Sequence, residues 1–157
     1  MDYRQALDIA RGRPSADERF IEACTIVSGA PQASNEERVD ALINRAIAYS
    51  LTKRHSLALA DLDEAIRRDP GYARPYTNRG GVHYQTGNDE AALADYTKAI
   101  ELDFDNAIAH FGQANVFRRM KVYDKAIAAM GLACALDENN PHMRSEEHTS
   151  ELQSRQY

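Results

Sequence analysis

The sequence has few of the features on which several classes of protein depend. Its 157 residues include two cysteines, too few for a disulfide framework. No stretch approaches the roughly 18 apolar residues that a membrane-spanning helix needs. The opening residues, MDYRQALDIARGRP, have no apolar core behind their charges. We therefore expect no secretory signal as written, and a cytoplasmic location provided that Met1 is the true start.

The charge is also of the wrong sign for a nucleic-acid-binding protein. The formal net charge is −5, so a general phosphate-binding surface is not expected. Apolar residues make up 43% of the chain and charged residues 27%, which is typical of a globular protein rather than a disordered one. The length suits one domain. We expect neither nucleic acid nor a membrane as a partner.

Motifs of catalysis and metal binding are missing too. The sequence contains no CxxC, HExxH or GxSxG and no phosphate-binding loop. Its histidines have no zinc-like spacing, and the local cluster of acids is expected on the solvent side of a helix, where Glu64 can pair with Arg67 and Arg68. We therefore expect no catalytic residue, no metal and no cofactor. The residues considered are His55, His83, His110, His142, His148, Asp61, Asp63 and Glu64.

A repeat with a period of 34 residues runs through the chain. Residues 60–70 read ADLDEAIRRDP, and residues 94–104 read ADYTKAIELDF. The same shift aligns columns of small residues and columns of large ones, which indicates a stacked repeat protein. The columns are Ala46/Gly80/Ala114, Ala58/Ala92/Ala126, Ala65/Ala99/Ala133, Leu62/Tyr96/Met130 and Tyr49/His83/Phe117. Cys24 and Cys134 share a column with Ile66 and Ile100, so we expect both thiols to be buried.

Each unit contains two helical patterns. In the second unit these span residues 75–86 and 90–102, separated by a stop and a cap at Gly87 and Asn88. Proline at position 70, after Asp69, is expected to end the second helix of the first unit. The small columns let neighbouring helices approach closely, and the large residues fill the space beside them.

These columns resemble the tetratricopeptide repeat family, over residues 39–140 in three units of about 39–72, 73–106 and 107–140. The resemblance implies an all-α fold, a right-handed α-solenoid of stacked antiparallel helix pairs. Phe104 and Glu138 depart from the family's terminal proline, and Lys53 and Lys121 from its mid-unit glycine. We expect these departures to affect turn geometry more than the fold. The ungapped units favour a bacterial relative.

The resemblance also implies a function. The first helix of each unit would line a concave groove that binds a protein or an extended peptide. Three arginines against Asp40 give the groove about +2, which favours an acidic peptide or a free carboxylate. The expected groove residues are Asn44, Arg74, Asn78, Tyr84, Gln85, Phe111, Asn115, Arg118 and Arg119. An open alternative is that the N-terminal residues cover Ile43, Ile47 and Leu51.

Some members of the family clamp the acidic C-terminus of chaperones with lysines, asparagines and an arginine. Those positions correspond to Ile43, Ile47, Asn78, Ile108 and Gly112, of which only Asn78 agrees. We therefore expect an interaction module without that clamp and without catalysis. The alternatives are a self-associating spacer, or the regulatory arm of an enzyme whose catalytic part lies elsewhere.

The two ends differ from the repeats. Residues 1–33 are expected to form a degenerate hairpin that caps the stack, with a short helix at residues 3–10 and another from Ser15 to Val27, opened by a capping box of Ser15 and Glu18. A second box, Ser34 and Glu37, is expected to open residues 35–143. Residues 144–154 resemble a translated sequencing adapter, so 144–157 is expected to be a non-native tail. A lost fourth unit would leave an apolar flank able to self-associate.

Overall fold

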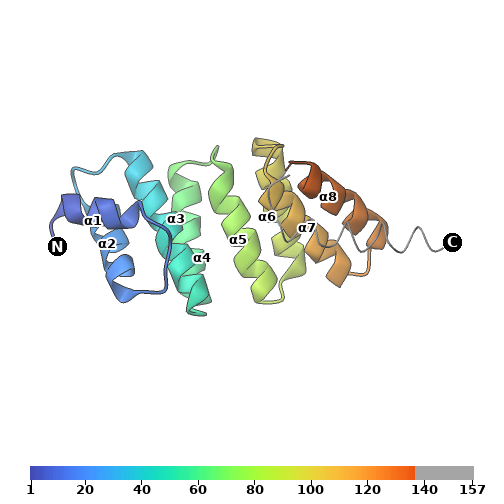
Figure 1. The fold of residues 1–157 in the computed structure, drawn as a ribbon, viewed down its shortest axis with the longest axis horizontal. Coiled ribbons are helices and arrows are strands. Elements are labelled where there is room, and N and C mark those ends of the chain that lie inside the picture. The colour runs from blue at the N-terminus through green and yellow to red at the C-terminus, as the bar shows by residue number, and fades with distance from the viewer. Residues whose placement is uncertain (137–157) are drawn as a thin grey trace.

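The computed structural model describes residues 1–136, which form eight α-helices and no strand (Figure 1). The expectations about residues 137–157, including the fourth unit and the non-native tail, lie outside the described residues. The helices are α1 (Tyr3–Ala10), α2 (Glu18–Gly29), α3 (Asn35–Leu51), α4 (His55–Arg68), α5 (Ala73–Gln85), α6 (Asp89–Leu102), α7 (Ala107–Arg119) and α8 (Tyr123–Leu136).

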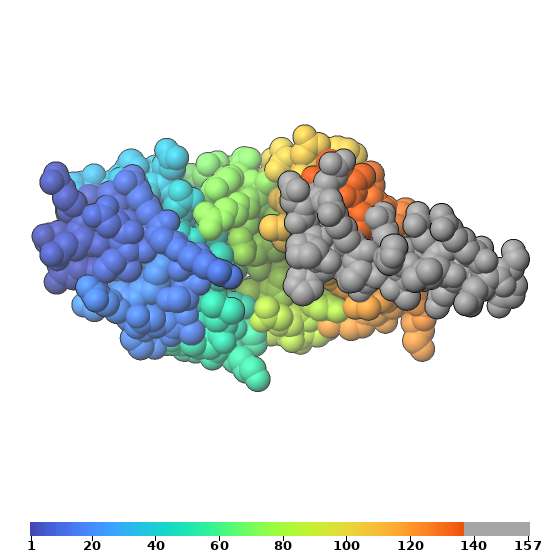
Figure 2. Space-filling view, viewed as in Figure 1, coloured from blue at the N-terminus to red at the C-terminus, as the bar shows by residue number. Residues whose placement is uncertain are grey.

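Successive helices pack as antiparallel pairs, and the pairs stack along the long axis of the molecule (Figures 1 and 2). The pairs α3–α4, α5–α6 and α7–α8 are each in contact, and α3, α5 and α7 also touch one another in sequence. These three helices make an inner row, while α4 and α6 bridge from one pair to the next. The expected all-α solenoid is confirmed.

The turn between the two helices of each unit has a left-handed residue in all three units, although this residue is lysine in two units and glycine in one. Gly87 has a φ of 81°, and Lys53 and Lys121 have φ values of 57° and 63°. Left-handed backbone costs a non-glycine residue roughly 1–2 kcal/mol. The two lysines therefore leave the turn geometry unchanged, contrary to our expectation, and the surrounding helices hold it in place.

Side-chain caps fix the ends of the N-terminal helices. Ser34 and Glu37 form the expected capping box at α3, and Asp2 and Gln5 form another at α1. The expected box at Ser15 is wrong, because Asp17 caps α2 and accepts from the backbone N–H of Arg19. Asp17 lies next to the first helical residue, which places its carboxylate within reach of the unpaired N–H groups. The helix therefore starts three residues later than predicted.

A buried ion pair joins the inner and outer helices of the first unit. The Arg45 guanidinium donates two hydrogen bonds of 2.7 Å to the Asp61 carboxylate and a third, of 2.9 Å, to the Thr25 hydroxyl of α2. Asp61 is therefore buried rather than solvent-facing as expected. The hydrogen bond with Asp61 raises the pKa of Arg45, so the guanidinium stays protonated. Glu64 does pair with Arg67 and Arg68 at the surface, as expected.

The second unit repeats this arrangement 34 residues later, and the third does not. Arg79 binds Asp95 at 2.8 and 2.7 Å and Asp63 of the preceding outer helix at 2.8 Å. In the third unit the corresponding residue is Gln113, which bonds Thr97 of α6 at 3.1 Å. The carboxylate is replaced by Ala129 on α8. An inner-helix side chain thus bonds the preceding outer helix in every unit, but it forms an ion pair with the outer helix of its own unit only in the first two.

Tyr96 of α6 passes between two glycines of the inner row. An ideal Cβ at Gly80 of α5 would lie 3.0 Å from its ring atoms, and one at Gly112 of α7 would lie 2.3–2.7 Å away. In the preceding unit the smaller Leu62 replaces the tyrosine, and Ala46 and Asn78 replace the glycines. The large ring is therefore accommodated by the loss of two neighbouring side chains.

Burial agrees with the expectation for one of the two cysteines. Cys24 and His110 are buried, and His110 bonds the carbonyl oxygen of Phe104 through Nε2 at 2.9 Å. Burial raises the pKa of the Cys24 thiol to about 12. Cys134 of α8 is half-buried rather than buried. His83 is half-buried and lies 3.8 Å from Asp95.

We expect Gly112→Ala to lower the free energy of unfolding by about 2 kcal/mol, because its methyl group overlaps the Tyr96 ring. Urea unfolding followed by circular dichroism measures the change. Gly131→Ala in α8 is the matched control, since nothing lies within 4 Å of its Cβ. It should stabilise the chain by up to about 1 kcal/mol. Adding Tyr96→Leu should recover most of the loss; equal effects of both alanines would contradict the packing described.

We expect Asp95→Ala to destabilise the chain by about 3 kcal/mol, because it leaves the Arg79 charge half-buried without its main partner. The double change Arg79→Gln with Asp95→Ala copies the third unit and should cost less than the single one. Glu64→Ala, which breaks a surface pair, should cost less than about 1 kcal/mol. A single and a double variant of equal stability would argue against a buried charge.

Candidate functional site

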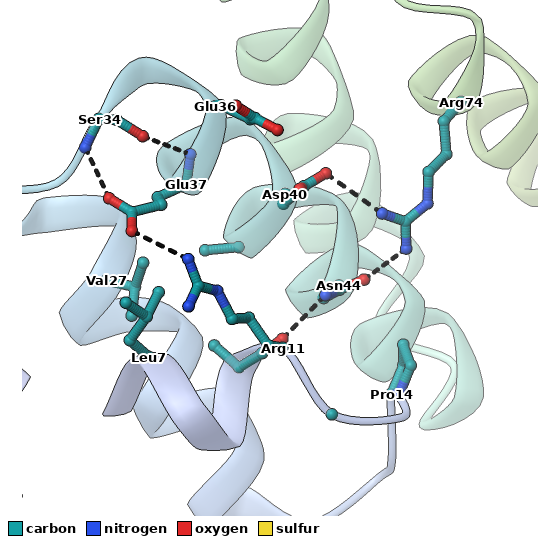
Figure 3. A pocket seen from close by; sticks show the side chains of 13 residues that line it. Leu7, Arg11, Pro14, Val27, Ser34, Glu36, Glu37, Asp40, Asn44 and Arg74 are labelled. Carbon is teal, nitrogen blue, oxygen red and sulfur yellow. Dashed lines mark hydrogen bonds and ion pairs between the residues drawn. The ribbon is translucent and has the colours of Figure 1, made fainter. Parts of the chain in front are cut away.

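The inner row of helices carries a line of polar side chains that begins in a cavity beside α1. The cavity has a volume of about 450 Å³ and lies between α1, the start of α3 and Arg74 of α5 (Figure 3). Asn44, whose residue is 6% exposed, donates to the carbonyl oxygen of Ala10 at 2.9 Å. Its own carbonyl oxygen accepts from Arg74 at 2.6 Å, and Asp40 accepts from the same guanidinium at 3.3 Å. Asn44 therefore links three helices.

The outer edge of this cavity is held by Glu37. Its carboxylate accepts from the backbone N–H of Ser34 at 2.8 Å, from the Tyr3 hydroxyl at 2.9 Å and from Arg11 at 3.3 Å. The hydrogen bonds from Ser34 and Tyr3 lower the pKa of Glu37, so it is ionised at neutral pH. The acids and bases of the cavity are mostly paired with one another, which makes it a structural joint between α1 and the repeats.

A second hollow lies in the middle of the concave face, with a volume of about 230 Å³. Its walls are Ile47 and Leu51 of α3 and Ile108 of α7, and Leu51 and Ile108 are 60% and 66% exposed. Its remaining lining residues are Ala46, Ser50, Leu62, Thr77, Asn78, Gly81, Val82, Gln85 and Tyr96. The Ser50 hydroxyl donates to the Gln85 side chain at 3.0 Å, so polar groups of α3 and α5 join across this face.

The far end of the inner row is basic. Arg119 of α7 forms an ion pair with Asp89 of α6, donates to the carbonyl oxygen of Tyr84 at 2.9 Å and lies 3.7 Å from the centre of its ring. Arg118 donates to Asn115 at 3.0 Å, and it has no acidic partner within the described part of the chain. Arg118 is exposed.

The structure brings the expected groove residues together only in groups. Asn44 joins Arg74, Tyr84 joins Arg119, and Asn115 joins Arg118, while Gln85 lies at the central hollow with Asn78. Phe111 is half-buried between these groups. The expected surplus of +2 omitted Asp89, so three arginines face Asp40 and Asp89 and the surplus is +1. Arg118 is the arginine of this set without an acidic partner among residues 1–136.

At the start of the groove, Ile43 is covered by residues of the repeats, and the cluster that buries it contains no residue of the N-terminal segment 1–34. Ile43 is buried in a core cluster with Leu42 and Val39, Ile47 is half-buried, and Leu51 is open. Sequence reasoning missed Asp89 and the hydroxyl of Tyr96. The aspartate is not on an inner helix, and Tyr96 was assigned to the core from its column alone.

The described residues offer neither a cluster of metal-binding side chains nor a helix suited to span a membrane. Residues 1–136 hold no group of three or more histidine, cysteine or acidic side chains placed to bind a metal ion. None of the eight helices described is both long and apolar enough to cross a bilayer.

Comparison with known proteins identifies the repeats. Residues 39–72 match the family described as "Tetratricopeptide repeat", and residues 82–121 match "TPR repeat". The yeast small glutamine-rich tetratricopeptide repeat-containing protein 2 is 41% identical over 64 residues, covering 41% of this chain and 18% of its own length. The yeast heat shock protein STI1 is 35% identical over 75 residues, covering 48% and 13%. The chain thus spans less than a fifth of either relative.

Solved structures share the fold. The crystal structure of MamA has a TM-score of 0.70 at 20% identity, covering 87% of this chain and 79% of that one. The TPR domain of Arabidopsis OM64 has a TM-score of 0.67 at 23% identity, covering 74% and 96%. The second TPR of Spaghetti (RPAP3), bound to the HSP90 peptide SRMEEVD, has a TM-score of 0.62 at 19% identity, covering 65% and 94%.

We expect Asn44→Ala to cost about 2 kcal/mol of stability, because it leaves the buried carbonyl of Ala10 without its donor and removes the shorter of the hydrogen bonds that Arg74 makes in the cavity. Asn78→Ala is the control one repeat later; Asn78 is half-buried and its amide bonds only Arg74 of its own helix. It should cost less than about 1 kcal/mol. Urea unfolding compares the two, and equal losses would show that Asn44 is not the joint described.

Proposed function

We propose that this chain, which contains tetratricopeptide repeats, is a non-catalytic interaction module that binds an acidic, extended peptide segment of a partner protein on its concave face. The residues proposed to bind it are Asn78, Tyr84, Gln85, Phe111, Asn115, Arg118 and Arg119, with Asn44 and Arg74 holding the N-terminal end in place. The domain units expected from the sequence, a cap at 1–33 and repeats from 35, belong to the same proposal.

The observation that carries the proposal is the central hollow, together with the exposed Arg118 at the far end of the inner row. Leu51 and Ile108 expose apolar surface at a hollow whose lining also offers the side-chain amides of Asn78 and Gln85 and the hydroxyl of Ser50. Arg118 supplies a guanidinium without an acidic partner in residues 1–136, and such a group binds carboxylates with two hydrogen bonds. An extended peptide can present an apolar and an acidic side chain to both features at once.

Structural neighbours support the class of ligand. Two TPR domains of RPAP3 with this fold are bound to the HSP90 peptide SRMEEVD. That peptide contains three acidic residues, two glutamates and an aspartate. Because only Asn78 matches the chaperone-clamp positions, we propose that acidic peptides are held here by the Arg118 end of the groove rather than by that clamp.

A second function is favoured by α8. Tyr123, Ile127 and Leu132 are 59%, 71% and 41% exposed, and Ala126–Leu136 contains no charged residue. The equivalent stretches of α4 and α6 carry several charges. Self-association through α8 would cover this surface. The regulatory arm of an enzyme stays the third alternative, since the chain spans a small part of its relatives.

Three predictions from the sequence are retained with this proposal. They are a cytoplasmic location, a bacterial relative and an adapter-derived tail at 144–157. Genomic sequence through the codon for Met143 tests the last, because the tail is native only if the genome encodes it.

We expect a random dodecapeptide display library, selected on the 157-residue chain, to yield sequences rich in acidic residues. Synthetic copies should bind Arg118→Ala at least about fivefold more weakly and with less salt dependence, because the charge-assisted hydrogen bonds of its guanidinium are lost. Arg19→Ala on α2 removes the same charge away from the groove and should leave binding unchanged. Fluorescence anisotropy at several salt concentrations measures the affinities.

The same experiment can reject the proposal. Failure to enrich any sequence, or equal weakening by Arg118→Ala and Arg19→Ala, would remove the groove as a peptide site. Sedimentation of the chain over a range of concentrations then decides the alternative. Growth in mass that Ile127→Glu abolishes would assign α8, rather than the groove, as the functional surface.

A further inference from the structure

The hydroxyl of Tyr96 reaches the surface of the central hollow and has no hydrogen-bond partner among the described residues. The residue is 6% exposed, and its oxygen makes no hydrogen bond with any described residue. Its ring lies between Gly80 and Gly112, and an ideal Cβ at Gly81 would lie 3.7 Å from the oxygen. Tyr96 and Gly81 both line the central hollow of the concave face. The hydroxyl therefore lies at the floor of this hollow.

Because its oxygen makes no bond within the described part of the fold, the hydroxyl is free to bond water or a ligand that enters the hollow. The chain provides a direct comparison in Tyr76 of α5, which is buried to a similar degree. The Tyr76 hydroxyl donates to the carbonyl oxygen of Pro70 at 3.0 Å. One buried phenol is thus satisfied within the fold, while the other is directed at a surface hollow.

The protonation state of Tyr96 makes it a donor. Burial raises the pKa of its hydroxyl to about 12, with a further contribution from Tyr84 and Asp95. At neutral pH the group keeps its proton, so it can donate a hydrogen bond to an acceptor oxygen.

We propose that Tyr96 binds the peptide in the groove, by donating a hydrogen bond from its hydroxyl to a carbonyl or carboxylate oxygen of that peptide. The inference rests on the proposed function. It assigns Tyr96, at the floor of the central hollow, as a residue that contacts the bound peptide. Because Ile47, Leu51 and Ile108 form the walls, an aliphatic side chain of the same peptide lies beside that oxygen.

Asn78 is placed to complete the contact. Its amide group donates to the carbonyl oxygen of Arg74, and its own side-chain oxygen has no partner among the residues described. Asn78 lines the same hollow as Tyr96. A peptide unit has one acceptor and one donor, so it can accept from the Tyr96 hydroxyl and donate to the Asn78 oxygen.

Two tyrosine-to-phenylalanine variants test the proposal, each removing one oxygen. In Tyr96→Phe the midpoint of urea unfolding should stay where it is, whereas in Tyr76→Phe it should fall because an intramolecular hydrogen bond is lost. Tyr96→Phe should bind the synthetic dodecapeptides from the library about five- to tenfold more weakly. Tyr76→Phe should bind them with unchanged affinity.

The outcomes separate the two proposals. If Arg118→Ala weakens the dodecapeptides and Tyr96→Phe does not, the groove binds peptide but Tyr96 takes no part. If Tyr96→Phe lowers the unfolding midpoint as Tyr76→Phe does, its hydroxyl has a partner within the fold and the inference is wrong. If the library yields no binding sequence, the proposed function itself fails.

A last comparison identifies the acceptor. Each acidic residue of a dodecapeptide is replaced in turn by its amide. If Tyr96→Phe no longer weakens binding of a peptide with one particular acid replaced, the carboxylate of that acid is the acceptor of the Tyr96 hydrogen bond. If Tyr96→Phe weakens binding of every such peptide, the acceptor is a backbone carbonyl.

Discussion

The stack of helices depends on a guanidinium held between outer helices. Arg45 reaches α4 of its own unit and α2 of the pair before it, and Arg79 does the same with α6 and α4. A buried arginine needs both partners, since a charge left half-paired in the interior is costly. It therefore links each of the first two units to the helix pair before it and helps to hold the spacing between these pairs.

Within this spacing, the size of one side chain decides where the face is open. Leu62 and Tyr96 occupy equivalent positions, but the tyrosine ring needs glycine at 80 and 112. The glycines bring its hydroxyl close to the surface and remove side chains that would have covered it. The hollow and its polar floor thus have the same origin as the packing of the core.

Much of the fold could be predicted from the sequence because it is periodic. The 34-residue columns placed the repeat helices to within about two residues, and the box at Ser34 has local chemistry that a sequence shows directly. The ion pair was missed because Asp61 was judged by its neighbours on one helix, although Arg45 and Arg79 recur with the same period. Asp89 and the Tyr96 hydroxyl could not be placed without knowing how the ring passes between two helices.

The third unit has lost the arginine, its carboxylate and most of the charge on its outer helix. In a linear array each unit is stabilised mainly by its neighbours, so local stability follows the strength of each junction. Amide hydrogens of α7 and α8 should therefore exchange with solvent faster than those of α3 to α6, through partial opening from the C-terminal side. Arg118 and Ile108 both lie on α7. A ligand that bridges the central hollow and α7 would therefore slow the local unfolding of α7 and α8, and its binding would be coupled to their folding.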